Sequence, residues 1–179
     1  NLLTMKKLLL PFLLLLSISL SAQKPLEYDS IIEVKGITKN DIYVQVNDWL
    51  ATTFNSANDV IQMADKGAGK FIAKGQVNYS SGKMMYNCTD GVLSFTIKVS
   101  VRDNKFRFIL TQINHKARGN STCEFGTITD AELFQIKGGG KKWKNKVWLD
   151  IKSKAVDLHS NLLSSITDKV KKFDKDEDW

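Results

Sequence analysis

The strongest constraint on the fold is a run of strict alternation between apolar and polar residues that begins at Leu93 and ends at Arg102. Successive side chains of a strand point to opposite faces of its sheet, so a period of two predicts a strand with one buried and one solvated face. The apolar members are Leu93, Phe95, Ile97, Val99 and Val101, and the polar members are Ser94, Thr96, Lys98, Ser100 and Arg102.

The next segment predicts a partner for this strand. Asp103-Asn104 is a two-residue turn signal, and the segment KFRFILTQI returns with Phe106, Phe108 and Leu110 on the buried side. The two strands therefore form an antiparallel hairpin with one apolar face. Other elements must cover that face.

Two amphipathic helices can provide the cover. Thr38 followed by Asp41 is a helix start, because the Thr38 side chain accepts from free N–H groups and the carboxylate lies at the positive helix end. A second helix is expected from Lys142 over about eight turns. The apolar stripe of the first helix is Ile42, Val46, Trp49, Leu50 and Phe54, and that of the second is Val147, Ile151, Ala155, Leu158, Leu162, Ile166 and Val170. Trp49 is therefore expected in the core.

The remaining segments complete the fold prediction. SIIEVKG predicts a strand before the first helix, and VIQM, a turn at Asp65–Gly69 and KFIAKGQVNYS follow that helix. The order is β-α-β-β-β-β-α, which predicts an α+β fold with an antiparallel sheet covered on one face by two helices. We expect Asn114–Gly140 to be a long connection. The alternative is another α+β sandwich in which this stretch adds a strand.

Several of these features together resemble one protein family. They are the entry GITKNDIY, Trp49-Leu50 in the first helix, the turn VIQMADKGAGK and Gly75 in the following strand. In this combination the chain resembles the DUF4468 family, a bacterial family of secreted domains of unknown function with a fold like that of the TATA-binding protein. The resemblance extends more loosely to the C-terminal helix. It implies a fold and no activity.

The start of the chain predicts export. Lys6 and Lys7 precede the apolar run LLLPFLLLLSISL, and the small residues up to Ala22 offer a processing site. This is typical of a signal peptide in residues 1–22, with Met5 as the expected start. Residues 23–179 would then be one exported domain, periplasmic or extracellular, with a frayed acidic tail KDEDW and no transmembrane segment. An uncleaved membrane anchor is the alternative.

Charge favours an anionic partner. The formal net charge is +7, and export makes nucleic acid an unlikely partner, which leaves acidic polysaccharide, anionic lipid headgroups or an acidic envelope protein. The solvated face of the sheet is the first candidate surface, with binding residues Lys74, Lys98, Arg102 and Arg107 beside Gln76 and Thr96. The second is a lysine cluster around Trp143 and Trp148: Lys137, Lys141, Lys142, Lys144 and Lys146. The first is also explained as the ordinary exposed side of a sheet, and the second as a lysine-rich helix entrance whose tryptophans belong to the core.

Motifs for catalysis are incomplete. Gly67-Ala68-Gly69-Lys70 is followed by Phe71 and a strand, whereas a phosphate loop needs Ser or Thr after the lysine and then a helix. His115 and His159 are not spaced as a metal-binding pair, and both are expected at the surface. We therefore expect no catalytic residue, cofactor or metal, and an enzyme of unrecognised type remains an alternative.

The two cysteines, Cys88 and Cys123, are expected to form a disulfide. Two cysteines in an exported chain usually pair. Both lie beyond the open end of the predicted hairpin, a few residues out of the register that Arg102 opposite Lys105 sets, and loops there can absorb the offset. The sequence thus favours a non-catalytic binding or assembly module of the cell envelope, or a structural part of an envelope complex.

Overall fold

A computed structural model describes residues 23–54, 60–119, 121–134 and 142–173. The expected signal peptide, the acidic tail, Lys137 and Lys141 lie outside these residues. The described elements are β1 (Tyr28–Glu33), α2 (Lys39–Thr53), β2 (Ile61–Asp65), β3 (Lys70–Tyr79), the 3-10 turn η1 (Met84–Thr89), β4 (Gly91–Arg102), β5 (Lys105–Ala117), the 3-10 turn η2 (Ser121–Cys123), β6 (Gly126–Thr127) and α4 (Lys142–Lys172).

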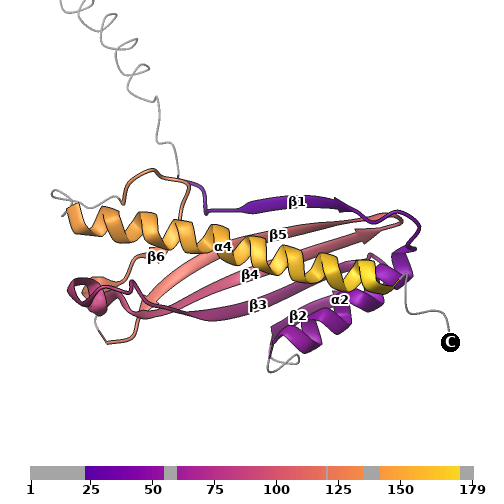
Figure 1. The fold of residues 1–179 in the computed structure, drawn as a ribbon, viewed down its shortest axis with the longest axis horizontal. Helices are drawn as coiled ribbons and strands as arrows, with labels where there is room; N and C mark the ends of the chain where they lie inside the picture. The colour runs from indigo at the N-terminus through magenta and orange to yellow at the C-terminus, as the bar shows by residue number, and fades with distance from the viewer. Residues whose placement is uncertain (1–22, 55–59, 120, 135–141, 174–179) are drawn as a thin grey trace, which may run out of the picture.

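The strands form one antiparallel sheet in the order β1-β5-β4-β3-β2, with β6 paired to β5. Helix α4 lies across the strands, and α2 packs beside it near one end of the sheet (Figure 1). The predicted α+β fold, with two helices covering one face, is confirmed.

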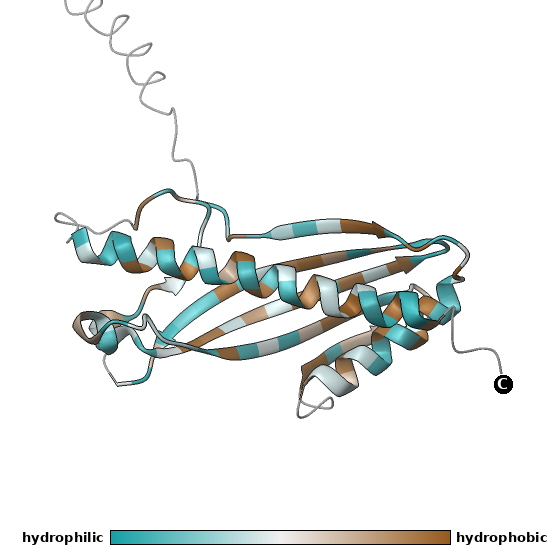
Figure 2. Cartoon of the chain, in the orientation of Figure 1, coloured by the Kyte–Doolittle hydropathy of each residue, from teal (hydrophilic) through white to brown (hydrophobic). Residues whose placement is uncertain are grey.

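The β4–β5 hairpin has the predicted register. Arg102 pairs with Lys105 across the turn, and Asn104 has the positive φ of 64° that a two-residue hairpin turn uses. All eight apolar side chains predicted for the buried face of this hairpin are buried. Apolar and polar residues alternate visibly along the strands in Figure 2.

Helix α2 begins and packs as its sequence predicts. The Thr38 side chain accepts a hydrogen bond from the Asp41 N–H at 3.3 Å, which caps the first turn. Trp49 is 2% exposed and donates its Nε1–H to the Ser165 hydroxyl of α4 at 3.0 Å. The prediction that Trp49 belongs to the core is confirmed.

Helix α4 covers the middle of the sheet with its apolar stripe. The stripe residues are buried except Leu158, which is half-buried. Trp148 is also buried and donates its indole N–H to the Ala131 carbonyl at 3.0 Å. Among the described helices, none is both long enough and apolar enough to span a bilayer.

The prediction of a long connection at Asn114–Gly140 is wrong. Strand β5 continues to Ala117, and the short β6 pairs with it, so this stretch does add a strand as the alternative proposed. A bulge explains the error: Gln112 has a φ of 54°, and the β4–β5 register shifts beside it. The extra residue turns the side chains of Ile113, His115 and Ala117 toward the core. The alternation of buried and exposed residues therefore changes phase within β5 and is not visible as one continuous pattern in the sequence.

The sheet has two contrasting ends. We call the β4–β5 turn, the β2–β3 turn and the start of α2 the hairpin end, and η1, η2, β6 and the start of α4 the disulfide end. Cys88 and Cys123 are bonded there, with Cα atoms 5.9 Å apart, which confirms the predicted disulfide. Figure 1 shows the two ends at opposite tips of the molecule.

Candidate functional site

The face of the sheet opposite the helices carries the predicted basic residues. Register places Lys70, Ser100, Arg107 and Ile31 side by side in one row across four strands. The next row toward the disulfide end is Ile72, Lys98, Ile109 and Asp29, and the one after it holds Lys74, Thr96 and Thr111. Cations and isoleucines therefore lie next to one another on this face.

Thr96 does not project into solvent as predicted. Its side chain is 5% exposed and donates a hydrogen bond to Gln112 Oε1 at 2.8 Å. The bulge at Gln112 brings that amide over Thr96 and removes it from the accessible surface. Lys74, Arg102 and Arg107 are exposed, and Lys98 is half-buried.

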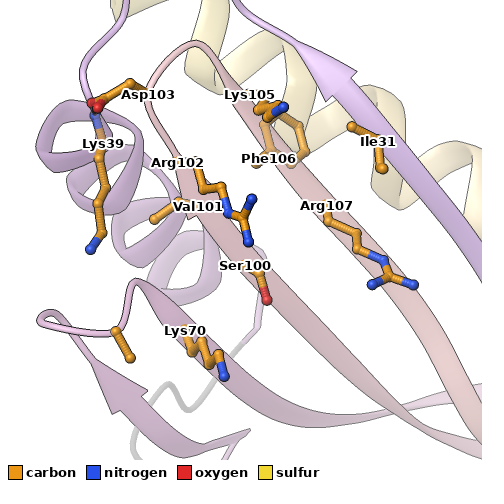
Figure 3. A pocket seen from close by; sticks show the side chains of 11 residues that line it. Ile31, Lys39, Lys70, Ser100, Val101, Arg102, Asp103, Lys105, Phe106 and Arg107 are labelled. Carbon is orange, nitrogen blue, oxygen red and sulfur yellow. Dashed lines mark hydrogen bonds between the residues drawn. The ribbon is translucent and has the colours of Figure 1, made fainter.

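A hollow of about 710 Å³ opens on this face at the hairpin end. We call it the basic hollow. Figure 3 shows Ser100 between the side chains of Arg102 and Lys70, with Arg107 on the neighbouring strand. The residues lining it are Ile31, Lys39, Ala68, Lys70, Ser100, Val101, Arg102, Asp103, Lys105, Phe106 and Arg107.

Hydrogen bonds donated by backbone N–H groups hold the walls of the basic hollow in place. Asp103 Oδ1 accepts from the Lys39 N–H at 2.7 Å, and Asn104 Oδ1 accepts from the Gly36 N–H at 2.8 Å. On the other side, the Val101 N–H donates to the Gly69 carbonyl at 2.8 Å. A side chain at Gly69 would lie within 2.7 to 3.0 Å of Lys39 and Val101 atoms, so only glycine allows this approach. The hollow is therefore a fixed feature of the fold.

The charges around the hollow are only partly compensated. Arg107 forms a two-pronged ion pair with Asp29, whose hydrogen bonds lower the pKa of the Asp29 carboxyl. Within the described part of the chain, Lys70, Arg102 and Lys105 have no carboxylate within ion-pair distance. These three cations are available to an incoming anion.

Sequence reasoning found part of this site. Arg102 and Arg107 were predicted on the face and line the hollow, whereas Lys74 and Lys98 lie on the face outside it. Lys70, Lys105 and Ser100 were not predicted as binding residues. Ser100 and Arg107 are opposite each other in the register that the Asp103-Asn104 turn sets, so that turn was the usable signal. Lys70 joins them only through the β3–β4 pairing.

A second hollow, of about 520 Å³, lies between α2 and α4. It is lined by Asp168 and by Lys169, and Lys169 already pairs with Asp48 at 2.5 Å. Its lining carries charges of both signs, Asp168 beside Lys169 and Lys172, so it is the weaker candidate for binding a charged partner.

The prediction that both histidines lie at the surface is wrong. His115 is fully buried: its Nε2 lies 2.8 Å from the Thr89 carbonyl, and the Phe125 N–H donates to its Nδ1 at 3.3 Å. These partners require a neutral ring with its proton on Nε2. His159 is half-buried against the Tyr28 ring, with centroids 5.4 Å apart.

Burial lowers the pKa of both histidines, which keeps them neutral near pH 7. Across the described ranges, no group of three His, Cys, Asp or Glu side chains is arranged to hold a metal ion. The contacts of His115 tie η1 to β5 and to the segment after η2, so its visible role is structural.

Comparisons with known proteins identify the fold. The family model described as a domain of unknown function (DUF4468) with TBP-like fold matches residues 28–116. The crystal structure of a DUF4468 family protein from Bacteroides ovatus is similar with a TM-score of 0.59 at 14% identity, over 84% of this chain and 91% of that chain. A TBP-like protein from Parabacteroides distasonis gives a TM-score of 0.53 at 10% identity, over 80% and 93%. No curated protein matches the chain.

Proposed function

We propose a binding role for this chain, which belongs over residues 28–116 to the DUF4468 family of domains with a TBP-like fold. In this proposal it is an exported, non-catalytic module of the bacterial cell envelope. Its basic hollow binds an acidic polypeptide segment of an envelope partner. Family membership gives the fold, and the proposal rests on the site.

One observation carries the proposal: Lys70, Arg102 and Lys105 surround the hollow, and within the described residues none of them has an ion-pair partner. Three uncompensated cations in a concave site attract an anion and raise its local concentration. Ser100 adds a hydroxyl that can donate a hydrogen bond to a carboxylate.

Apolar surface beside these cations favours a polypeptide. Ile31 lines the hollow and is 64% exposed, and half-buried isoleucines lie in the next row of the face. An acidic segment of a protein offers carboxylates and apolar side chains together, whereas an acidic polysaccharide offers mainly hydroxyl and carboxylate groups. The mixed lining therefore fits a protein partner better.

The proposal is tested with poly-L-glutamate as the probe. Binding by the chain from Gln23 onward is measured by titration calorimetry, and we expect binding that weakens as salt is added. The variant K70E/R102E should lower the affinity about tenfold or more, because two attractive contacts become repulsive. Arg107 is left intact, since its charge is already paired with Asp29.

The matched control is K142E/K146E, which makes the same change in net charge at the disulfide end. Both lysines are exposed, so this variant should bind poly-L-glutamate nearly as well as the unmodified chain. An equal loss in both variants would show that only net charge matters and would refute a site in the hollow. A hydrolase or transferase activity that a single polar substitution abolishes would overturn the non-catalytic role.

A further inference from the structure

The disulfide end carries an exposed apolar tip. Met84 and Met85 are adjacent in η1, and their side chains are 90% and 81% exposed. Both exceed every other large apolar side chain in the described residues, of which Ile31 at 64% comes next. We call this pair the methionine tip. Scattered apolar residues are normal on a surface, but two neighbours this exposed suggest a contact with something else.

The fold holds the methionine tip rigidly. The Cys88–Cys123 bond closes the end of η1, and the Thr89 hydroxyl donates to the Tyr86 carbonyl at 2.7 Å. The Asp90 side chain accepts from the Ser81 N–H at 3.0 Å, which fixes the entry of the loop. Because the loop is already ordered, little conformational entropy is lost when the tip binds.

Aromatic rings lie directly behind the tip. Tyr86, the next residue of η1, stacks on Trp143 of α4 with ring centroids 6.1 Å apart, and Trp143 is half-buried. Tyrosine and tryptophan combine an apolar ring with a polar group, which is why they concentrate at membrane–water boundaries.

Cations surround the tip and its aromatic base. Lys83 directly precedes Met84, and Lys142 and Lys146 are exposed on the first turns of α4 beside Trp143. Lys144 lies with its Nζ 5.6 Å from the Trp143 ring centre and 3.1 Å from the Thr122 carbonyl. The carboxylates of neighbouring segments, Asp90, Glu124 and Glu132, are fewer than these four lysines and leave the balance positive.

We propose that the methionine tip docks on a lipid bilayer that contains anionic headgroups. The methionines enter the edge of the hydrocarbon, the half-buried Trp143 lies at the interface against the buried Tyr86 ring, and the lysines contact the headgroups. An apolar pair, a tryptophan and several lysines thus occur together at this end, and they suit the hydrocarbon edge, the interface and the headgroups of a bilayer.

A protein partner fits the tip less well. A stable protein interface buries about 800 Å² on each partner, which is far more than two adjacent methionine side chains offer. A lipid surface needs no matching shape and gains from each buried methylene and each nearby lysine. This inference concerns the opposite end of the molecule from the basic hollow and does not depend on the proposed function.

The test is cosedimentation with vesicles of phosphatidylglycerol mixed with phosphatidylcholine, and with vesicles of phosphatidylcholine alone. The chain from Gln23 onward is used, because it contains every described strand and helix and lacks the apolar run before Ala22, which would partition by itself. We expect binding to the anionic vesicles, weaker binding to phosphatidylcholine alone, and release as salt is added.

Two variants remove the two kinds of contact. M84S/M85S should lower the partition coefficient about tenfold or more through lost burial, and K142E/K146E should do so through lost attraction. M63S, at a methionine of β2 that is 38% exposed, and K70E/R102E, with the same charge change at the hairpin end, should bind as the unmodified chain does. Thermal unfolding checks that each variant is folded.

Absence of binding to the anionic vesicles would overturn the proposal. Binding that survives M84S/M85S would also overturn it, because the tip would then be unnecessary. An equal loss in K70E/R102E and K142E/K146E would mean that overall charge alone attracts the vesicles, and this too would contradict a localised docking tip.

Discussion

At the hairpin end, two strands join through a two-residue turn, and the Asp103 side chain of that turn accepts a hydrogen bond from the first N–H of α2. The core beneath is packed by aliphatic and aromatic side chains. At the disulfide end, two 3-10 turns and the two-residue β6 are joined by a covalent bond and by the buried His115. A tight hairpin turn and hydrogen bonds from that turn to the start of α2 order the first end, and a disulfide with a buried histidine orders the second.

The two ends also expose different side chains to solvent. The polar links of the hairpin end join its turns to the start of α2 and to each other, and within the described residues they leave Lys70, Arg102 and Lys105 free on its open face. The disulfide end is held by its links and can therefore expose Met84 and Met85 without losing core. Each end thus offers a different surface chemistry from a fixed scaffold.

The largest effect on stability is expected from Trp49→Ala, in the apolar stripe of α2. Removing this buried ring should lower the free energy of unfolding by about 3 to 5 kcal/mol. Denaturant unfolding measures it, with Val44→Ala on the exposed side of the same helix as the control, expected within about 0.5 kcal/mol of the unmodified protein. A loss for Trp49→Ala below about 1 kcal/mol would contradict a core held by packing.

Removal of the disulfide should have a somewhat smaller and more local effect. C88A/C123A opens a loop with a sequence separation of 35 residues and should lower the free energy of unfolding by about 3 to 4 kcal/mol in the chain-entropy view. Hydrogen exchange should speed up in η1, η2 and β6 and stay slow in the β4–β5 hairpin near Asn104. Uniform acceleration at both ends would remove the distinction between them.

Acid should weaken the disulfide end first, through His115. Burial lowers the pKa of His115 in the folded protein, so below about pH 6.5 the unfolded chain binds a proton that the folded chain does not. The free energy of unfolding should therefore fall as the pH drops below about 6.5, by up to about 1.4 kcal/mol per pH unit until the folded-state pKa is reached.

His115→Gln should flatten this part of the pH profile, although it lowers stability at pH 7. His159→Gln is the matched control, since the pKa of His159 is also lowered by burial but its ring lies nearer the surface. A profile unchanged in His115→Gln would show that the buried ring does not control the acid sensitivity.

The smallest effect on stability is expected from Asp29→Asn at the hairpin end. The Arg107–Asp29 pair is exposed, and exposed ion pairs contribute little, so the denaturation midpoint should stay within error. The same substitution frees the Arg107 guanidinium and should strengthen binding of poly-L-glutamate. Weaker binding would mean that Asp29, rather than the cations, organises the hollow.

Sequence reasoning succeeded where the structure is local. The alternation from Leu93 to Val101, the Asp103-Asn104 turn and the Thr38 cap each act over a few residues, and all three lie at or lead to the hairpin end. The disulfide followed from the hairpin register together with the expectation of export. The helical cover of the sheet then followed from the need to bury one face.

The same reasoning failed where one extra residue in a strand, a β-bulge, interrupts the alternation of buried and exposed side chains. The positive φ at Gln112 shifts the later side chains of β5 by one position, so the core residues Ile113 and His115 were not recognised. No local pattern marks that bulge, because glutamine is not a typical residue for this conformation. Lys70 was missed for a related reason: its place beside Ser100 depends on pairing between β3 and β4.

The central claim, that the hairpin end binds an acidic segment in the basic hollow, is tested most directly by mapping where poly-L-glutamate binds. Backbone amide chemical shifts of the chain from Gln23 onward are followed by NMR during titration with this probe. The account predicts that the largest shifts occur at Lys70, Ser100, Arg102 and Lys105 and disappear in K70E/R102E. Shifts that instead centre on Lys142–Lys146, or that spread evenly over exposed lysines, would contradict it.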